Sequence, residues 1–509
     1  MKKLICVCLT AIMLFALALP AAADTLLISP APNLPEKWDG TVAEAFAGGT
    51  GTEADPYLVS NAKELALIAK NVNEKTSDYL NVYFKQTADI NLDGAAWDAI
   101  GHGKEVLSFK GTYDGGNFTV YNILNLPVDP ADTKVMIYNG LFGWISDSAV
   151  VKNVKMVGGT VTSTKYAGAV VGFMTGGTVY NCVSDIEAVY GFQSGGIVGR
   201  AEKGDKNIIK GCVNHSPVTV PADMAAQSSV FLGGIVGAAG NTEILYCANY
   251  GDITADNSTN YSVAGGMIGI QGASSGTVLI DNCVDMGKIT AMKTNAKYVG
   301  AGGICGKAAH VSFSKIYNCV TAGTYISDAD KATGGIAGFV DPAKLVTIDN
   351  LYTNAEKAAG DDELKQLADT VVLKLDEMKG PAGITKMKLN SAWVAEADML
   401  PTIDVAKIDV AQEEPAVTET TTTVTTTEAT TTVATTEATT TEATTAETTT
   451  EATTAPVTEP SDDITVDNEY PEDPVVLRDN TVLIIVLSVA IVAVIGAMVG
   501  VMVVSKKKG

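Results

Sequence analysis

The sequence predicts an all-β protein whose central part is a parallel β-helix, a solenoid of short strands stacked in successive coils. One phrase, in which an aliphatic pair lies between glycines, recurs seven times between residues 140 and 338. The final glycines of these phrases lie 27 to 38 residues apart (199 − 172 and 237 − 199). A repeat of this length is typical of solenoids. The final glycines are Gly143, Gly172, Gly199, Gly237, Gly269, Gly306 and Gly338.

Two further phrases accompany the glycine phrase and divide each repeat into three parts. A cysteine follows most copies at a regular interval, and a Gly-x-Ile/Val-Thr phrase such as 251–254 or 287–290 closes the clearer units. Three short strands separated by turns predict a three-faced coil in which alternate residues point inward. The glycine pairs are typical of a corner where φ is positive or where the backbone passes close to a neighbour. Asn181, Asn282 and Asn318, each beside a cysteine, are typical of a turn or a stacked amide.

The cysteines allow two interpretations. Of eight, Cys6 and Cys8 lie in the leader, and five others occupy the same place in successive repeats. Stacked rungs lie about 4.8 Å apart, but a disulfide also needs a specific side-chain dihedral angle. We therefore expect a reduced, inward-facing ladder, with disulfides as the alternative. The residues concerned are Cys182, Cys212, Cys247, Cys283, Cys305 and Cys319.

The N-terminus and the charge indicate where the protein acts. Residues 1–23 have two lysines, an apolar run and an Ala-Ala-Ala site, which is the pattern of a secretory signal peptide. The net charge is −23, and the sequence contains only two arginines, Arg200 and Arg478. Nucleic-acid binding needs clustered cationic side chains. We therefore expect an exported protein that does not bind nucleic acid.

Residues 24–135 lack the repeat and are expected to form an N-terminal cap together with the first coils. An amphipathic helix is predicted at 61–73, with Leu65, Ile68, Ala69 and Val72 on one face. Strand-turn-strand units are predicted at 82–92 and 109–120. A solenoid needs such a cap to keep its first edge from pairing with other chains. The repeats proper are expected at 136–350, and a C-terminal closure at 351–408.

The remainder of the chain predicts a stalk and a membrane anchor. Residues 409–480 are dominated by threonine and cannot bury a core, so we expect a disordered stalk. The uncharged run 481–504 is long enough to span a bilayer, and the basic tail 505–509 places the C-terminus in the cytoplasm. The protein is thus predicted to be a single-pass protein of the cell membrane with an extracellular ectodomain. Gly496 and Gly500 form a GxxxG pair through which two such helices could form a homodimer.

The linked order of several phrases resembles one known family. GTEADPYLV, a helix, DINL, a WxxIG turn at 97–101, FKGTYDGGNFTV, GLFG and the iterated GGIVG copies follow one another between residues 38 and 402. This order resembles the GLUG-motif family of bacterial surface proteins. The resemblance implies a right-handed parallel β-helix in an extracellular, adhesin-like protein, and we expect a Gram-positive-type cell surface.

Recurrent aromatic residues before the glycines are the candidate ligand-facing positions. A stacked aromatic row exposed along a groove would suit a sugar or a peptide, whereas buried stacking in the core is the alternative. We therefore expect adhesion to a host or environmental glycan or to a matrix protein, with a structural envelope spacer as another hypothesis. The candidate residues are Tyr166, Phe192, Phe231, Tyr261 and Tyr298.

A polysaccharide-active lyase or hydrolase is the rival hypothesis, and the residues argue against it. His102 and Asp361 lie in fragments that resemble a polygalacturonase set, but their order is reversed and no basic element accompanies them. The histidines are too scattered for a zinc-peptidase helix. Residues 89–94 match half a calcium loop, but Ile100 occupies the position of the final glutamate. We expect no catalytic residue, no metal and no cofactor.

Overall fold

The computed structural model describes the cap, the coils and the segment that follows them. The described residues are 34–102, 108–125, 138–202, 206–221, 227–256, 258–271, 276–292, 296–308, 314–328, 333–340, 346–355 and 370–408. The leader, stalk and anchor predicted for 1–23, 409–480 and 481–504, the tail 505–509 and the glycine pair Gly496 and Gly500 lie outside the described residues. In the described part of the chain, no helix is both long enough and apolar enough to cross a bilayer.

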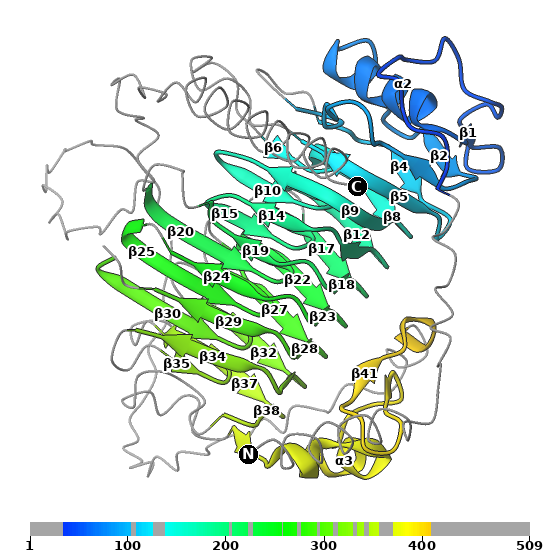
Figure 1. The fold of residues 1–509 in the computed structure, drawn as a ribbon. Helices are drawn as coiled ribbons and strands as arrows, with labels where there is room; N and C mark the ends of the chain where they lie inside the picture. Colours follow the sequence, from blue (N-terminus) through cyan, green and yellow to red (C-terminus); the bar gives the residue numbers. More distant parts are fainter. Residues whose placement is uncertain are drawn as a thin grey trace, which may run out of the picture. The chain divides into compact units, whose positions relative to one another are not determined.

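The central residues form a parallel β-solenoid, as predicted, in which successive rungs stack along one axis (Figure 1). A complete turn contains five strands distributed over four sheets, for example β15 to β19. The three-strand unit predicted from the phrases is therefore wrong. The backbone changes direction in the middle of the glycine phrase and again in the middle of the cysteine phrase. Each of these two phrases therefore contributes two strands where the sequence predicted one.

Sheets I and II each contain seven strands. Sheet I consists of β6 (Tyr138–Asn139), β10 (Tyr166–Gly168), β15 (Gln193–Gly195), β20 (Gln227–Gly233), β25 (Ser258–Gly265), β30 (Tyr298–Gly302) and β35 (Thr333–Gly334). Sheet II consists of β7 (Phe142–Ser146), β11 (Val171–Thr175), β16 (Val198–Ala201), β21 (Val236–Ala239), β26 (Ile268–Gln271), β31 (Cys305–Ala308) and β36 (Ala337–Val340).

Sheet III has ten strands and begins in the cap. Its strands are β1 (Tyr57–Val59), β2 (Tyr83–Gln86), β4 (Thr112–Asp114), β8 (Val150–Lys152), β12 (Gly177–Tyr180), β17 (Asn207–Lys210), β22 (Thr242–Leu245), β27 (Val278–Asp281), β32 (Ser314–Tyr317) and β37 (Val346–Asp349). The strands expected within 82–92 and 109–120 are thus present and continue the coil.

Sheet IV has fifteen strands in two branches that meet at β9 (Lys155–Thr162). One branch contains β14 (Ala188–Tyr190), β19 (Val218–Thr219), β24 (Ile253–Ala255), β29 (Lys288–Ala291) and β34 (Thr324–Ser327). The other contains β13 (Val183–Asp185), β18 (Val213–Asn214), β23 (Ala248–Asn249), β28 (Val284–Asp285), β33 (Val320–Thr321), β38 (Tyr352–Thr353) and β39 (Val371–Val372). Two earlier strands, β3 (Ile90–Asn91) and β5 (Thr119–Leu124), pair with each other, and β5 pairs with β9.

The glycine phrase forms a double-layered region in the wall of the coil. We call this region, which consists of sheets I and II and their connections, the glycine seam. A Cβ atom on Gly269 in sheet II would lie 2.6 Å from the backbone nitrogen of Leu232 in sheet I. Sheets I and II therefore pack against each other through the faces that are turned away from the main core. The final glycines do not have positive φ, so close approach of the backbones is what requires glycine here.

The asparagines beside the cysteines mark a column of left-handed turns at the end of sheet III. Asn181, Asn282 and Asn318 have φ between +50° and +53°. Asparagine tolerates this conformation better than most residues. Two of them also bond between rungs: Asn181 Nδ2 donates to Asn153 Oδ1 at 2.8 Å, and Asn318 Nδ2 donates to Asp281 Oδ1 at 2.9 Å. The turn is confirmed for all three, and the stacked amide for Asn181 and Asn318, whereas Asn282 bonds to the segment after the coils.

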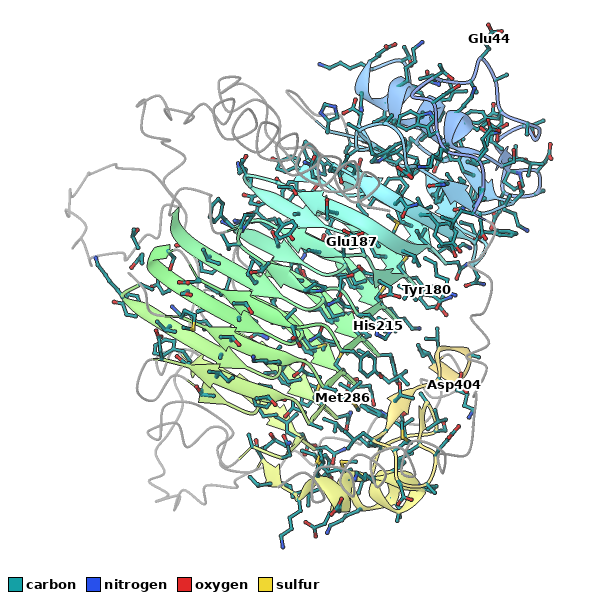
Figure 2. The ribbon with its side chains drawn as sticks, viewed as in Figure 1. Glu44, Tyr180, Glu187, His215, Met286 and Asp404 are labelled. Atoms are coloured by element: carbon teal, nitrogen blue, oxygen red, sulfur yellow. The ribbon has the colours of Figure 1, made fainter. Side chains whose placement is uncertain are left out.

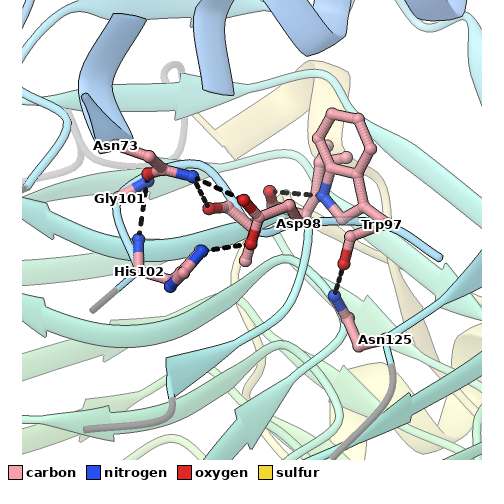
Figure 3. A network of polar contacts seen from close by, with 8 residues as sticks. Asn73, Trp97, Asp98, Gly101, His102 and Asn125 are labelled. Atoms are coloured by element: carbon pink, nitrogen blue, oxygen red, sulfur yellow. Dashed lines mark hydrogen bonds and ion pairs between the residues drawn. The ribbon is translucent and has the colours of Figure 1, made fainter. Parts of the chain in front are cut away.

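The cap is fastened to the first rung by its helix, α2 (Ala62–Asn73). Asn61 caps the helix by accepting a hydrogen bond from Glu64 N, and the predicted face of Leu65, Ile68, Ala69 and Val72 is buried. At the other end, Asn73 Oδ1 accepts hydrogen bonds from the backbone nitrogens of Gly101 and His102 (Figure 3). Trp97 Nε1 donates to Leu141 O at 3.1 Å, which ties the WxxIG turn to the first glycine phrase.

The segment after the last coil contains η2 (Leu375–Met378), α3 (Gly380–Lys386), η3 (Val405–Lys407) and the antiparallel pair β40 (Trp393–Val394) and β41 (Thr402–Ile403). The sequence predicted that 351–408 closes the end of the solenoid. Residues 373–408 contact the side of several rungs, where Met378, Met387 and Trp393 form a cluster with Ala248, Val284 and Val320. Apolar side chains on the outside of these rungs pack against the segment. Asp361 lies outside the described residues.

Candidate functional site

The five aromatic candidates do not form the single row that their places in the sequence suggested. Tyr166 pairs in register with Gln193, and Gln193 pairs with Phe231. Tyr261 pairs instead with Ser229 and Tyr298, two residues earlier along the strands. Phe192 belongs to the main core. The expected row therefore breaks into a core residue and two columns of the glycine seam. Phe192 lies one residue before the register position of Tyr166 and Phe231, and Tyr261 and Tyr298 lie two residues before it.

Tyr166 belongs to a buried cluster at the N-terminal end of the seam. It stacks on Tyr138 at 5.3 Å between ring centroids, and Phe173 of sheet II packs against both rings. The Arg200 guanidinium lies 5.1 Å from the Tyr166 ring and forms an ion pair with Glu202. Burial lowers the pKa of the Lys165 ammonium, and the charge of Arg200 lowers it further. Tyr166 is only 6% exposed, so it follows the core-stacking alternative.

The sequence interpretation missed the residues that sheet II contributes to this cluster. Trp144, Phe173 and Arg200 share one register column and face the aromatic column of sheet I. They follow the final glycine of each phrase by one residue. That regular offset was the available signal, but only the packing of the two sheets shows that the residues on either side of the glycines meet.

The second aromatic column reaches the surface, and we take it as the candidate functional site. Tyr298 stacks on Tyr261 with ring centroids 4.8 Å apart and planes 18° apart, and Tyr261 contacts Phe231 at 6.1 Å. Phe231 and Tyr261 are buried, whereas Tyr298 is 48% exposed. The Lys307 ammonium lies 4.7 Å from the centroid of the Tyr261 ring. The exposed Tyr298 ring is therefore supported from behind by the Tyr261 ring, which itself lies against the Lys307 ammonium.

A buried polar column runs inside the coil and contains the most perturbed carboxyl group of the core. Asn214 Nδ2 donates to Asn249 Oδ1 at 2.9 Å, and Asn249 Nδ2 donates to Asp285 Oδ1 at 2.8 Å. Tyr325 OH donates to Asp285 Oδ2 at 3.1 Å. Burial raises the pKa of Asp285 to about 7, although these hydrogen bonds oppose the shift. Asp285 is fully buried, so we assign this column to the stability of the coil.

The cysteines form the inward-facing column that the spacing predicted. Cys182, Cys212, Cys247, Cys283 and Cys319 are free thiols without exposed surface, and Cys305 is a buried free thiol in the glycine seam. Cys212 Sγ donates to Val179 O of the preceding rung at 3.6 Å. Burial raises the pKa of the Cys305 thiol, which keeps it protonated. These residues pack as small apolar side chains.

The described residues offer no assembled set for metal binding. Among them, no group of three or more histidine, cysteine, aspartate or glutamate side chains is placed to hold an ion. His102 pairs with Asp98, and His215 stacks on Tyr250 with ring centroids 5.1 Å apart. In the half calcium loop, Ile90 and Asn91 form β3, Gly94 turns with φ of +114°, and Ile100 is fully buried. The segment is thus a strand followed by a turn.

The fold defines the protein as an all-β parallel solenoid. Comparisons with known proteins show to which proteins the chain is similar. No family model matches the chain. A protein of Evansella cellulosilytica, provisionally named a Gly-rich membrane protein, is 29% identical over 149 residues, which cover 29% of this chain and 16% of that protein. Halomucin of Haloquadratum walsbyi is 28% identical over 174 residues, which cover 32% of this chain and 2% of that protein. The chain thus matches only a small part of either relative.

A solved structure is also similar. A protein of Bacteroides ovatus, provisionally described as an immunoglobulin A1 protease, aligns with a TM-score of 0.46 and 19% identity. The alignment covers 71% of this chain and 95% of that chain.

Proposed function

We propose that the protein is a GLUG-type surface solenoid that binds a glycan or a matrix protein outside the cell, displayed on the Thr-rich stalk and held by the membrane helix 481–504. The single observation that supports binding best is the stacked pair Tyr261 and Tyr298, which ends in a half-exposed ring and packs against Phe231 of the neighbouring column. An isolated surface tyrosine is common, but a ring fixed by a second ring loses little conformational freedom on binding. One relative is named as a membrane protein, which agrees with display at the surface.

Binding arrays test this proposal. The full-length protein in detergent is applied to broad arrays of glycans and matrix proteins, and each hit is measured again with Tyr298→Ala. We expect at least one hit, and we expect the variant to weaken it about tenfold, the loss that accompanies about 1.4 kcal/mol. Tyr121→Ala, a partly buried tyrosine of β5, is the matched control.

Two results would overturn the proposal. A blank on broad arrays would favour the spacer hypothesis, in which the solenoid has no ligand. Turnover of a polysaccharide by the purified protein would instead favour the enzyme hypothesis. The hydrolase form of that hypothesis requires two carboxyl groups held several ångströms apart across the bond that is cleaved.

A further inference from the structure

A hollow in the N-terminal cap carries an inference that goes beyond the aromatic column. It has a volume of about 720 Å³ and is lined by residues 42–46 and by Tyr57, Leu67, Lys70 and Asn71. This volume lies within the range of about 300–1,000 Å³ that ligand pockets occupy. Phe46 and Tyr57 are stacked in its wall with ring centroids 4.7 Å apart. The hollow therefore combines an aromatic wall with charged and amide groups.

The glycine loop of the cap holds the aromatic wall in place. Gly51 has φ of +79°, and a Cβ atom there would lie 2.5 Å from Cε2 of Tyr57. The absence of a side chain lets the Tyr57 ring lie flat against the loop. Phe46 then packs on Tyr57 and on the buried Phe84 at 5.4 Å. The Gly-Gly-Thr-Gly phrase, which the solenoid repeat does not explain, thus fixes two rings at the wall of the hollow.

The polar groups around the rings are available to a ligand. Lys70 is exposed near the end of α2, and Glu44 lies at the outer margin of the cap (Figure 2). Neither forms an ion pair with any residue that the structure describes. Asn71 Nδ2 donates to Tyr79 OH at 2.6 Å, and its Oδ1 accepts no hydrogen bond from the described residues. The hollow offers a cationic donor, an amide acceptor and a carboxylate, with balanced charge.

The backbone around the hollow argues against a peptide that would add as a strand. β1 is the first strand of sheet III. Leu58 N of β1 already donates to Gly48 O at 2.9 Å, and Thr50 N and Gly51 N both donate to Asp55 O at 3.0 Å. Strand addition relies on free main-chain groups along an edge. A ligand here must be recognised through ring faces and side-chain polar groups instead.

We propose that this hollow, which we call the cap pocket, binds a neutral saccharide, with one face of a sugar ring packed on the outer face of Phe46, which Tyr57 supports from behind, and its hydroxyl groups bonded to Lys70 and Asn71. A pyranose ring presents apolar C–H groups on its faces and hydroxyl groups, both donors and acceptors, around its edge. The aromatic wall suits the faces, and the mixed donors and acceptors suit the edge. Because Glu44 balances Lys70, the pocket does not select an anion. The inference rests on the glycan arm of the proposed function and adds a second site to it.

The test measures saccharide binding to full-length protein in detergent, first on an array of neutral and uronic-acid oligosaccharides and then by titration calorimetry with the strongest neutral ligand. We expect Lys70→Ala and Phe46→Ala to weaken that ligand at least tenfold. Lys85→Ala, an exposed lysine of β2, is the matched control for Lys70→Ala and is expected to bind like the wild type. Thermal unfolding of each variant shows whether it is folded, and Lys70→Ala removes only an exposed side chain.

The outcomes separate the cap pocket from the proposed function. Loss of the ligand in both pocket variants but not in Tyr298→Ala supports the cap pocket. Loss in Tyr298→Ala with full affinity in Lys70→Ala and Phe46→Ala overturns the cap pocket and leaves the proposed function standing. A preference for uronic acids, or for a peptide, that depends on Lys70 overturns the neutral-saccharide assignment. A blank array overturns the cap pocket and the glycan arm of the proposed function, and leaves its matrix-protein arm to the arrays described above.

Discussion

Asp285 lies in the middle of the buried polar column, where the neighbouring rungs carry asparagine or threonine. Its carboxyl group accepts hydrogen bonds from Asn249 and Tyr325 but is fully buried, and its pKa is raised to about 7. Desolvation disfavours the charged form. Since the pKa of the unfolded chain is close to 3.8, the contribution of Asp285 to stability is complete below pH 4 and is lost as the pH rises through 7.

This gives a prediction for Asp285→Asn. We expect the variant to be more stable than the wild type at pH 8 by about 1 to 3 kcal/mol, since it removes a buried charge. Its amide oxygen can still accept from Asn249, and its amide nitrogen can donate to the Tyr325 hydroxyl in place of the bond that Tyr325 donated. The difference should shrink as the pH falls and nearly disappear at pH 4. Urea unfolding followed by circular dichroism at several pH values measures it. A difference that does not change with pH would contradict the raised pKa.

At the scale of elements, the glycine seam depends on the absence of side chains where sheets I and II meet. In Gly269→Ala, the new methyl group would lie 2.6 Å from both Gly237 O and Leu232 N. Backbone atoms of two sheets cannot both move away, so we expect a loss of about 2 kcal/mol or more of unfolding free energy. Thermal unfolding measures the change.

The control for the seam is a glycine in an open place. A Cβ atom on Gly48 would meet only the Leu58 side chain at 3.4 Å, and φ of Gly48 is not positive. Gly48→Ala should therefore leave the melting temperature nearly unchanged. Equal effects of the two substitutions would show that the seam does not need glycine for close packing.

The C-terminal segment depends on Trp393, which is 3% exposed and donates from Nε1 to Asn282 Oδ1 at 3.1 Å. Truncating a buried tryptophan typically costs about 3 to 5 kcal/mol. We expect Trp393→Ala to release residues 373–408 from the rungs while the strands of the coil persist. Limited proteolysis should then cut within 373–408, with the β signal in circular dichroism unchanged. Met399→Ala, at a residue 60% exposed in the same segment, should resist proteolysis like the wild type.

At the scale of the whole molecule, the cysteine column reports on the integrity of the coil. The six cysteines of the solenoid are buried free thiols. We expect a thiol-alkylating reagent to leave all six unmodified in the folded protein and to modify all six after unfolding without a reductant. Mass spectrometry of the peptides checks both states. Cysteines that react only after reduction would show disulfides between rungs and would contradict the reduced column.

Much of the fold could be predicted from individual residues. Asn61 and the face of Leu65, Ile68, Ala69 and Val72 predicted α2, and the period of the glycines and cysteines predicted the stacking of rungs. The candidate site was harder to predict. Tyr166 and Phe192 occupy similar places before their glycines, yet one packs in the seam and the other in the main core. A shift of one residue along a strand moves a side chain to the opposite face of the sheet. Because the connections between the strands vary in length, such a shift cannot be recognised from the sequence.

The sequence by itself determined that the chain coils and stacks, because a repeated phrase places like residues on successive rungs whatever the cross-section of the coil. Only the tertiary structure decided that the glycine phrase folds two sheets against each other, that Tyr298 is the exposed end of its column, and that residues 373–408 pack along the side. The physical reason is that a period fixes the neighbour above and below each residue. Contacts across the coil depend on turn conformations and close approaches, such as those of Asn181 and Gly269, that no period specifies.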